Sequence, residues 1–143
     1  MPVPQEYTQA SRDFDRFMIA VRDALGHATT HQAYYSVLAV LLVFRRRVSV
    51  HHAIRFADAL PTVLRAMFVS EWDTREPVLR MATRAELTRE TQEFRREHSF
   101  TPDDAIEVVA RVLHQHTDPI RFDLALRELP SHAREFWSEQ PPP

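Results

Sequence analysis

The order of apolar and polar residues along the chain predicts helices almost throughout. Its first clear stripe has the i, i+3, i+4, i+7 spacing of an amphipathic helix, and it comprises Phe14, Phe17, Met18, Val21 and Leu25. We expect this helix to begin near Ser11 and to stop at Gly26, because glycine readily adopts the left-handed backbone that ends helices. The next helix, over 30–46, is apolar nearly all round, so it is predicted to be the buried central element.

Capping residues predict where several helices begin. Thr29 is followed three residues later by Gln32, and Thr83 by Glu86, which is the spacing of a capping box. Ser49 is placed to cap a third helix. Further helices are expected to begin at Pro61, at 102, at 118 and at 130, and the helix that begins at 83 is expected to run to about 97.

The chain divides into two halves of similar plan. The segment Leu60-Pro61-x3-Arg65-x2-Phe68 recurs as Leu129-Pro130-x3-Arg134-x2-Trp137, at an offset of 69 residues. The stretch between the halves has no helical periodicity and contains Pro77. We therefore predict an all-α, internally duplicated domain of about eight helices in two four-helix units that share one core. The expected parts are an N-terminal tail (1–10), the first unit (11–70), a connection (71–82), the second unit (83–138) and a Pro-rich tail (139–143).

Composition excludes several classes of function. The 143 residues are 44% hydrophobic and 27% charged, which is ordinary for a globular domain. There is no cysteine, all 18 basic residues are arginine, and only one glycine is present. Disulfides, thiolate zinc sites, Schiff-base lysines and glycine-rich phosphate loops are therefore excluded.

Charge and hydropathy bear on partners and location. The net charge is −2, so no global field attracts nucleic acid or an anionic membrane. The longest apolar stretch, over 33–44, is shorter than the roughly twenty residues that span a bilayer. Residues 1–6 lack the features of a secretory signal, so we expect a cytoplasmic protein that does not interact with membranes.

The repeated Leu-Pro-x3-Arg segments, Trp72-Asp73 and the closing Trp137 together resemble the bacterial family catalogued as domain of unknown function 2267. The resemblance covers roughly residues 11–138. One departure is Pro119-Ile120-Arg121, where the second half of the family usually has a glycine–glutamate pair. The resemblance implies a small, duplicated, all-helical bacterial protein, and it implies no activity.

Two pairs of residues stand out within the repeat. Arg65 and Arg134 each lie one turn into a helix, beside an aromatic residue. We interpret them as locking the two units by bonding to an acid or a carbonyl of the opposite half; the alternative is that the paired arginines bind an anion. Trp72 and Trp137 are candidates for the same locking or binding role, with Trp72 either filling the interface or exposed as an anchor for a partner.

One local cluster of cations is a candidate docking patch: Arg45, Arg46, Arg47 and Arg55. It could bind phosphate, RNA or an acidic partner, or it could be a solvated helix end that complements the helix dipole. We favour the solvated end, because no exposed aromatic residues alternate with the arginines to stack on bases. His27 and His31 have the i, i+4 spacing of two metal ligands on one helix face, but Gly26 and Thr29 predict a helix boundary between them. We therefore expect neither a metal nor another cofactor.

No catalytic group occurs together with the partners that it would need. The expected function is therefore a non-enzymatic interaction or assembly module, whose partner is an unknown protein or a second copy of the chain. The alternatives are a small-molecule or anion binder that uses the paired arginines, or a histidine-based metalloprotein.

Overall fold

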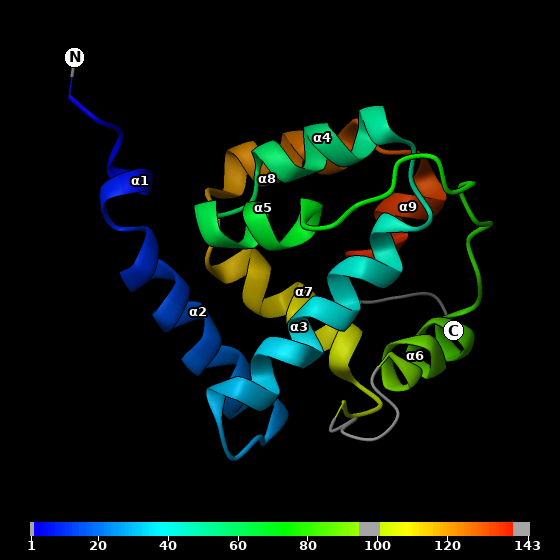
Figure 1. The fold of residues 1–143 in the computed structure, drawn as a ribbon, viewed down its shortest axis with the longest axis horizontal. Helices are drawn as coiled ribbons and strands as arrows, with labels where there is room; N and C mark the ends of the chain where they lie inside the picture. The colour runs from blue at the N-terminus through cyan, green and yellow to red at the C-terminus, as the bar shows by residue number, and fades with distance from the viewer. Residues whose placement is uncertain (1, 95–100, 139–143) are drawn as a thin grey trace.

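A computed structural model describes residues 2–94 and 101–138, and within these residues the protein is all-α, as predicted. The described residues form nine helices and no strand (Figure 1). The helices are α1 (Gln5–Thr8), α2 (Ala10–Leu25), α3 (Thr30–Arg45), α4 (Val50–Asp58), α5 (Thr62–Val69), α6 (Arg84–Glu93), α7 (Ala105–Gln115), α8 (Pro119–Arg127) and α9 (Ser131–Phe136).

Most of the predicted helix boundaries are confirmed by their hydrogen bonds. Gly26 ends α2 with a left-handed φ of 71°. The side chains of Thr29, Ser49 and Thr83 each accept the backbone N–H three residues later, at the first turns of α3, α4 and α6. The Asp118 carboxylate caps α8 in a similar way. Each cap satisfies a backbone donor that the first turn of a helix leaves without an intrahelical partner.

Two boundaries differ from the sequence prediction. The four-residue α1 lies inside the stretch expected to be an N-terminal tail. Helix α7 begins at Ala105 and not at 102. The polar side chains next to position 102 bond elsewhere and do not cap a helix: Thr101 Oγ1 lies 3.2 Å from Ser36 Oγ, and the Asp103 carboxylate accepts from Gln92 at 2.7 Å. The predicted extension of α6 to 97 and the Pro-rich tail over 139–143 lie outside the described residues.

Helix α3 is the centre of the molecule, as its apolar sequence predicts. It packs against α2, α5, α6 and α7, and in Figure 1 it crosses the middle of the fold with these helices around it. The buried side chains of both predicted units belong to one hydrophobic cluster. Trp137, from the last helix turn, is buried in that cluster and stacks on Phe56 of α4, with ring centroids 5.1 Å apart. The core is therefore shared, while duplication of the two units stays a prediction.

The repeated arginines bond to the end of the helix before them. Arg65 on α5 donates to the carbonyls of Ala57, Asp58 and Leu60, at 3.1–3.4 Å, where α4 ends. Arg134 on α9 makes the corresponding bonds at the end of α8, where it donates to three carbonyls at 3.1–3.2 Å. Each acceptor in the second set lies 69 positions after its counterpart in the first.

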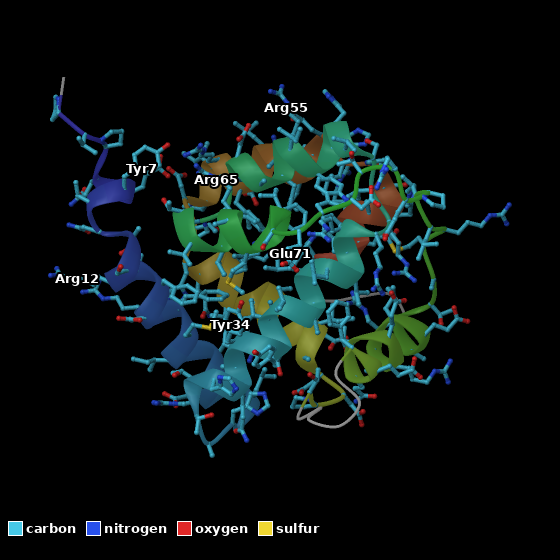
Figure 2. The ribbon with its side chains drawn as sticks, viewed as in Figure 1. Tyr7, Arg12, Tyr34, Arg55, Arg65 and Glu71 are labelled. Atoms are coloured by element: carbon cyan, nitrogen blue, oxygen red, sulfur yellow. The ribbon has the colours of Figure 1, made fainter. Side chains whose placement is uncertain are left out.

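These hydrogen bonds stay within one predicted unit, whereas the sequence interpretation placed the partners in the opposite half. The reason is the Leu-Pro turn, which folds each arginine-bearing helix back beside the end of its predecessor. Figure 2 shows Arg65 at this turn, between α5 and α4. Arg65 also lies 3.4 Å from the carboxylate of Glu6 on α1.

Three more arginines bond to helix ends in the same manner. Arg47 donates to the Val43 carbonyl at the end of α3, at 3.0 Å. Arg45 donates to two carbonyls at the end of α5, and Arg84 to two at the end of α9. The last carbonyls of a helix have no intrahelical partner, so a guanidinium with several donors can satisfy two or three of them together.

Within the described residues, no helix has the length and apolar character needed to cross a bilayer.

We predict that Arg65→Ala and Arg134→Ala each lower the free energy of unfolding by about 1–3 kcal/mol, because each leaves helix-end carbonyls without a donor. Lysine should restore only part of the loss, since an ammonium lacks the planar fork that reaches several carbonyls. Urea unfolding measures the change. Arg12→Ala is the control, because Arg12 is exposed on α2 (Figure 2). If both alanine variants have the same free energy of unfolding as the control, the capping role is contradicted.

Candidate functional site

A groove of about 390 Å³ lies where the C-terminal end of α3 meets the start of α4 and the loop between α5 and α6. In Figure 1 this loop runs around the end of α3 before it reaches α6. Its lining includes Arg45 and Arg46 from the end of α3, Trp72 and Val78 from the loop, and Phe94 from the end of α6. The groove therefore brings Arg45 and Arg46 of the predicted docking patch together with Trp72, which the sequence singled out as a locking or binding candidate.

Each arginine of the groove lies over an aromatic ring. The guanidinium carbon of Arg45 is 5.2 Å from the centre of the Trp72 ring, and that of Arg46 is 5.0 Å from the centre of the Phe94 ring. These are cation–π distances. Arg45 Nη1 also donates to the carbonyls of Phe68 and Ser70, at 2.9 and 3.1 Å. The end of α5 thus holds the Arg45 side chain against Trp72.

The loop that forms one wall is tied to the end of α3. The Leu79 N–H donates to the Arg46 carbonyl at 2.9 Å, and Arg47 Nε donates to the Arg80 carbonyl at 3.2 Å. These bonds hold the non-helical segment around Val78 and Leu79 along the groove. The wall is therefore anchored by one backbone bond and one side-chain bond, although the segment has no regular secondary structure.

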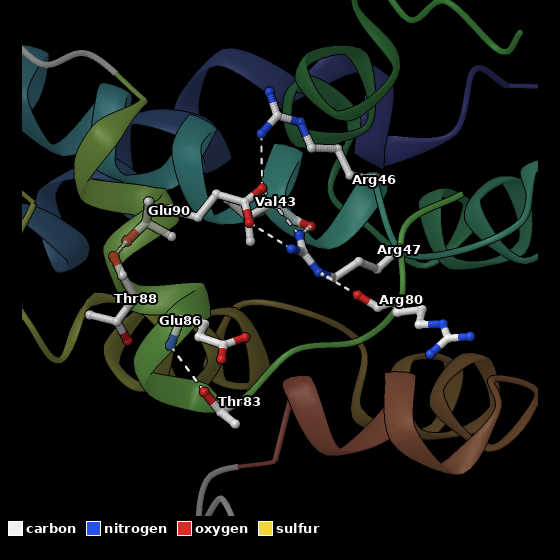
Figure 3. Close-up of polar contacts among 9 residues, drawn as sticks. Val43, Arg46, Arg47, Arg80, Thr83, Glu86, Thr88 and Glu90 are labelled. Atoms are coloured by element: carbon white, nitrogen blue, oxygen red, sulfur yellow. Dashed lines mark hydrogen bonds and ion pairs between the residues drawn. The ribbon is translucent and has the colours of Figure 1, made fainter. Parts of the chain in front are cut away.

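One carboxylate, that of Glu90 on α6, binds two neighbouring arginines (Figure 3). Arg47 donates to both of its oxygens, at 2.6 and 3.1 Å, and Arg46 donates at 2.8 Å. Burial raises the pKa of Glu90, but the hydrogen bonds from Arg47 and Arg46 outweigh burial and leave the pKa below its usual value. Glu90 is therefore held as an anion that joins α6 to the end of α3.

Arg45 and Glu76 have unequal surroundings in the groove. Burial, and then the neighbouring Arg46, lower the pKa of Arg45, while the nearby Glu76 carboxylate partly offsets them. Arg45 is half-buried and Glu76 is exposed. The groove thus contains a partly desolvated cation, whose attraction for an anion is stronger than that of a fully hydrated one.

The four arginines of the predicted docking patch separate into different roles. Arg45 and Arg46 line the groove, whereas Arg47 is only 8% exposed and is occupied by Glu90. Arg55 points outward from α4 (Figure 2) and lies 3.3 Å from the Glu128 carboxylate. Each of the four thus has a partner within the protein, and two of them also face the groove.

The residues predicted to lock the two halves also differ in their surroundings. Trp72 is half-buried in the groove, whereas Trp137 is fully buried against Phe44 and Phe56 of the first half. Arg65 and Arg134 bond to the ends of different helices, α4 and α8. The Trp137 ring is therefore one of the contacts between the halves, whereas the helix-end bonds of Arg65 and Arg134 lie inside each half.

Sequence reasoning missed Phe94, Glu76 and the apolar loop residues as parts of a site. Val78 and Leu79 are among the large apolar side chains that remain exposed. The available signal was weak: apolar residues at 78, 79 and 81, within a stretch that lacks helical periodicity and was interpreted only as a connection.

The histidines do not form a catalytic or metal site in the described part of the chain. His27 Nε2 lies 2.9 Å from Ser36 Oγ, as in a nucleophilic pair, but Ser36 is only 1% exposed and no substrate could reach it. Ser36 instead connects His27 to Thr101. His114 and His116 bond to backbone carbonyls at helix ends. Across residues 2–94 and 101–138, no group of three or more histidine, aspartate or glutamate side chains could hold a metal ion.

The fold and groove define a small all-α protein that carries the arginine- and aromatic-lined groove described above. A protein-family model matches residues 14–136, and the chain belongs to that family, described as "Uncharacterized conserved protein (DUF2267)". The family resemblance recognised in the repeated motifs is thereby confirmed. A comparison with curated proteins found no match.

We predict that Arg47→Met lowers the free energy of unfolding by about 2–4 kcal/mol, because Glu90 loses its two-point partner while remaining mostly buried. The double variant R47M/E90M should recover part of this loss, since the Glu90 carboxylate is removed as well, and Arg46, which also loses this partner, is exposed to water. Denaturant unfolding of the wild type, R47M, E90M and R47M/E90M gives the coupling between the two residues. Glu86→Met, on an exposed position of α6, is the control. If the changes in the free energy of unfolding simply add in the double variant, the coupling between Arg47 and Glu90 is contradicted.

A pH dependence follows from His27. Burial lowers the pKa of His27 below 6.5, so between that lowered pKa and 6.5 the unfolded chain binds more protons than the native protein. The contribution of His27 to stability is therefore complete above pH 6.5 and is lost as the pH falls through that window. Unfolding energies measured from pH 5 to 8 should show this loss in the wild type and a smaller one in His27→Gln. His132→Gln, on an exposed position of α9, should keep the wild-type profile; a profile unchanged in H27Q would refute the assignment.

Proposed function

We propose that this protein is a non-enzymatic interaction module of the cytoplasm, which binds a segment of a partner protein in the groove between α3, α4 and the loop that precedes α6. The observation that carries the proposal is the exposed apolar rim of the groove. Val78 is 56% exposed, and Val50 and Leu79 are also exposed, beside two guanidiniums held against aromatic rings. Apolar side chains grouped around a groove are typical of binding surfaces.

The extent of this rim favours a protein segment over a small molecule. Val50 lies on α4 and Leu79 on the loop, so the apolar surface continues along two walls of the groove. A ligand confined to about 390 Å³ would leave much of this rim in water, whereas an extended or helical peptide could cover it. Burial of apolar area is the main driving force of such association.

The charged groups of the groove support binding more than catalysis. General acid–base chemistry works best with a group whose pKa lies near the working pH. The arginines stay protonated, and the pKa of Glu90 is lowered by its two partners. The arginines that line the groove can therefore hold and orient an anion.

A library of random peptides displayed on phage, selected against the purified protein, tests the proposal. We predict that the selected peptides bind Val78→Asp at least about tenfold more weakly than wild type, a loss of about 1.4 kcal/mol. Because Val78 is exposed, the variant should melt as the wild type does.

Ile120→Asp is the matched control for this experiment. Ile120 is 74% exposed on α8 and does not line the groove, so the I120D variant should bind the peptides within about twofold of wild type. Selection of no peptide above background, or equal binding to V78D and wild type, would reject the proposed function.

A further inference from the structure

We propose that the segment bound in this groove is acidic and apolar: a peptide that places a carboxylate on Arg45 and Arg46 and an adjacent large apolar side chain against the rim. The inference rests on the proposed function and names the chemistry of its partner. It follows from the donors left on the two guanidiniums, the charge balance around them and the apolar surface beside them.

Both guanidiniums keep donors for a ligand. The hydrogen bonds of Arg45 to Phe68 and Ser70 both leave from Nη1, so in the described structure Nε and Nη2 have no such bond. Arg46 bonds to Glu90 through Nη1 alone, and its side chain is 41% exposed. The planar guanidinium presents its donors in pairs that match the two oxygens of a carboxylate.

The charges around the groove leave an excess of positive charge. Among the described residues that line the groove, Arg45 and Arg46 are cations and Glu76 is an anion. Glu90 is already shared between Arg46 and Arg47, so Glu76 is left facing Arg45. The groove therefore favours an anionic ligand, although the chain as a whole carries a net charge of −2.

The aromatic rings make the two cations ready to bind. Trp72 and Phe94 each support a guanidinium from one side, and the carbonyls at the end of α5 fix Arg45 further. A side chain that is already held in place loses less conformational entropy when a ligand binds. A carboxylate would thus bind to a formed pair of donors, and the half-exposed Val78 and Leu79 lie within the same groove for an apolar neighbour.

The same geometry disfavours a nucleic acid. Strong binding to a phosphate backbone needs several free cations along its path, but here Glu90 and Glu76 neutralise part of the local charge. Bases are usually held by stacking on aromatic faces, and one face of Trp72 and one of Phe94 are already covered by arginine.

The deciding experiment compares charge variants by calorimetric titration with peptides selected on the wild-type protein. Glu76→Gln removes the acid that competes for Arg45, so acidic peptides should bind it at least about threefold more tightly than wild type. Arg46→Gln should weaken binding about tenfold. Glu86→Gln changes the net charge equally on an exposed position of α6 outside the groove, and should leave binding within about twofold.

The outcomes separate this inference from the proposed function. Selected peptides rich in Asp or Glu beside a large apolar residue, bound more tightly by E76Q, support both. If the selected peptides are neutral or basic and do not bind V78D, or if acidic peptides bind E76Q more weakly than wild type, the acidic partner is overturned and the proposed interaction module is still supported. No selected peptide at all overturns both. The peptide assignment would also be overturned if a single-stranded oligonucleotide bound the wild type as tightly as the peptides do and did not bind V78D. It would be overturned as well if the wild type formed a dimer that V78D does not form.

Discussion

The carbonyl groups at the C-terminal ends of short helices need donors, and this requirement organises the whole structure. A helix commonly ends with a left-handed glycine that helps to satisfy these groups, but the chain has a single glycine, at the end of α2. Arginine side chains perform this role at five other helix ends. The arginines that do so are Arg45, Arg47, Arg65, Arg84 and Arg134. The high arginine content is therefore a structural feature before it is a surface property.

The candidate site is a consequence of the same bonds. Arg45 reaches the end of α5, and this bond places its guanidinium over Trp72, just beyond that helix. Arg47 caps α3 and binds both the loop carbonyl of Arg80 and the carboxylate of Glu90. Arg45 thus both caps a helix and lines the groove, and Arg47 holds α6 and the loop beside it. Their remaining donors and the unburied apolar residues beside them are what a partner could use.

The sequence predicts local features well and distant contacts poorly, for a physical reason. Thr29, Ser49 and Thr83 were recognised as caps because each bonds three residues away. Arg65 was recognised as important, but its partners were not, because a long flexible side chain can reach a neighbouring helix end as easily as a distant one. The groove was not predicted, because Phe94 and the loop that lines it meet only after α6 packs on α3.

Short helices whose C-terminal ends are capped by side chains of other helices affect how the protein unfolds. Helices α4, α5, α8 and α9 have nine, eight, nine and six residues, and isolated helices of such length are unstable in water. Each of them is closed by an arginine from another helix, so melting α5 removes the cap of α4 and melting α9 removes the cap of α8. The native state should therefore open as one cooperative body, with backbone amides of both halves exchanging with solvent through the same global event.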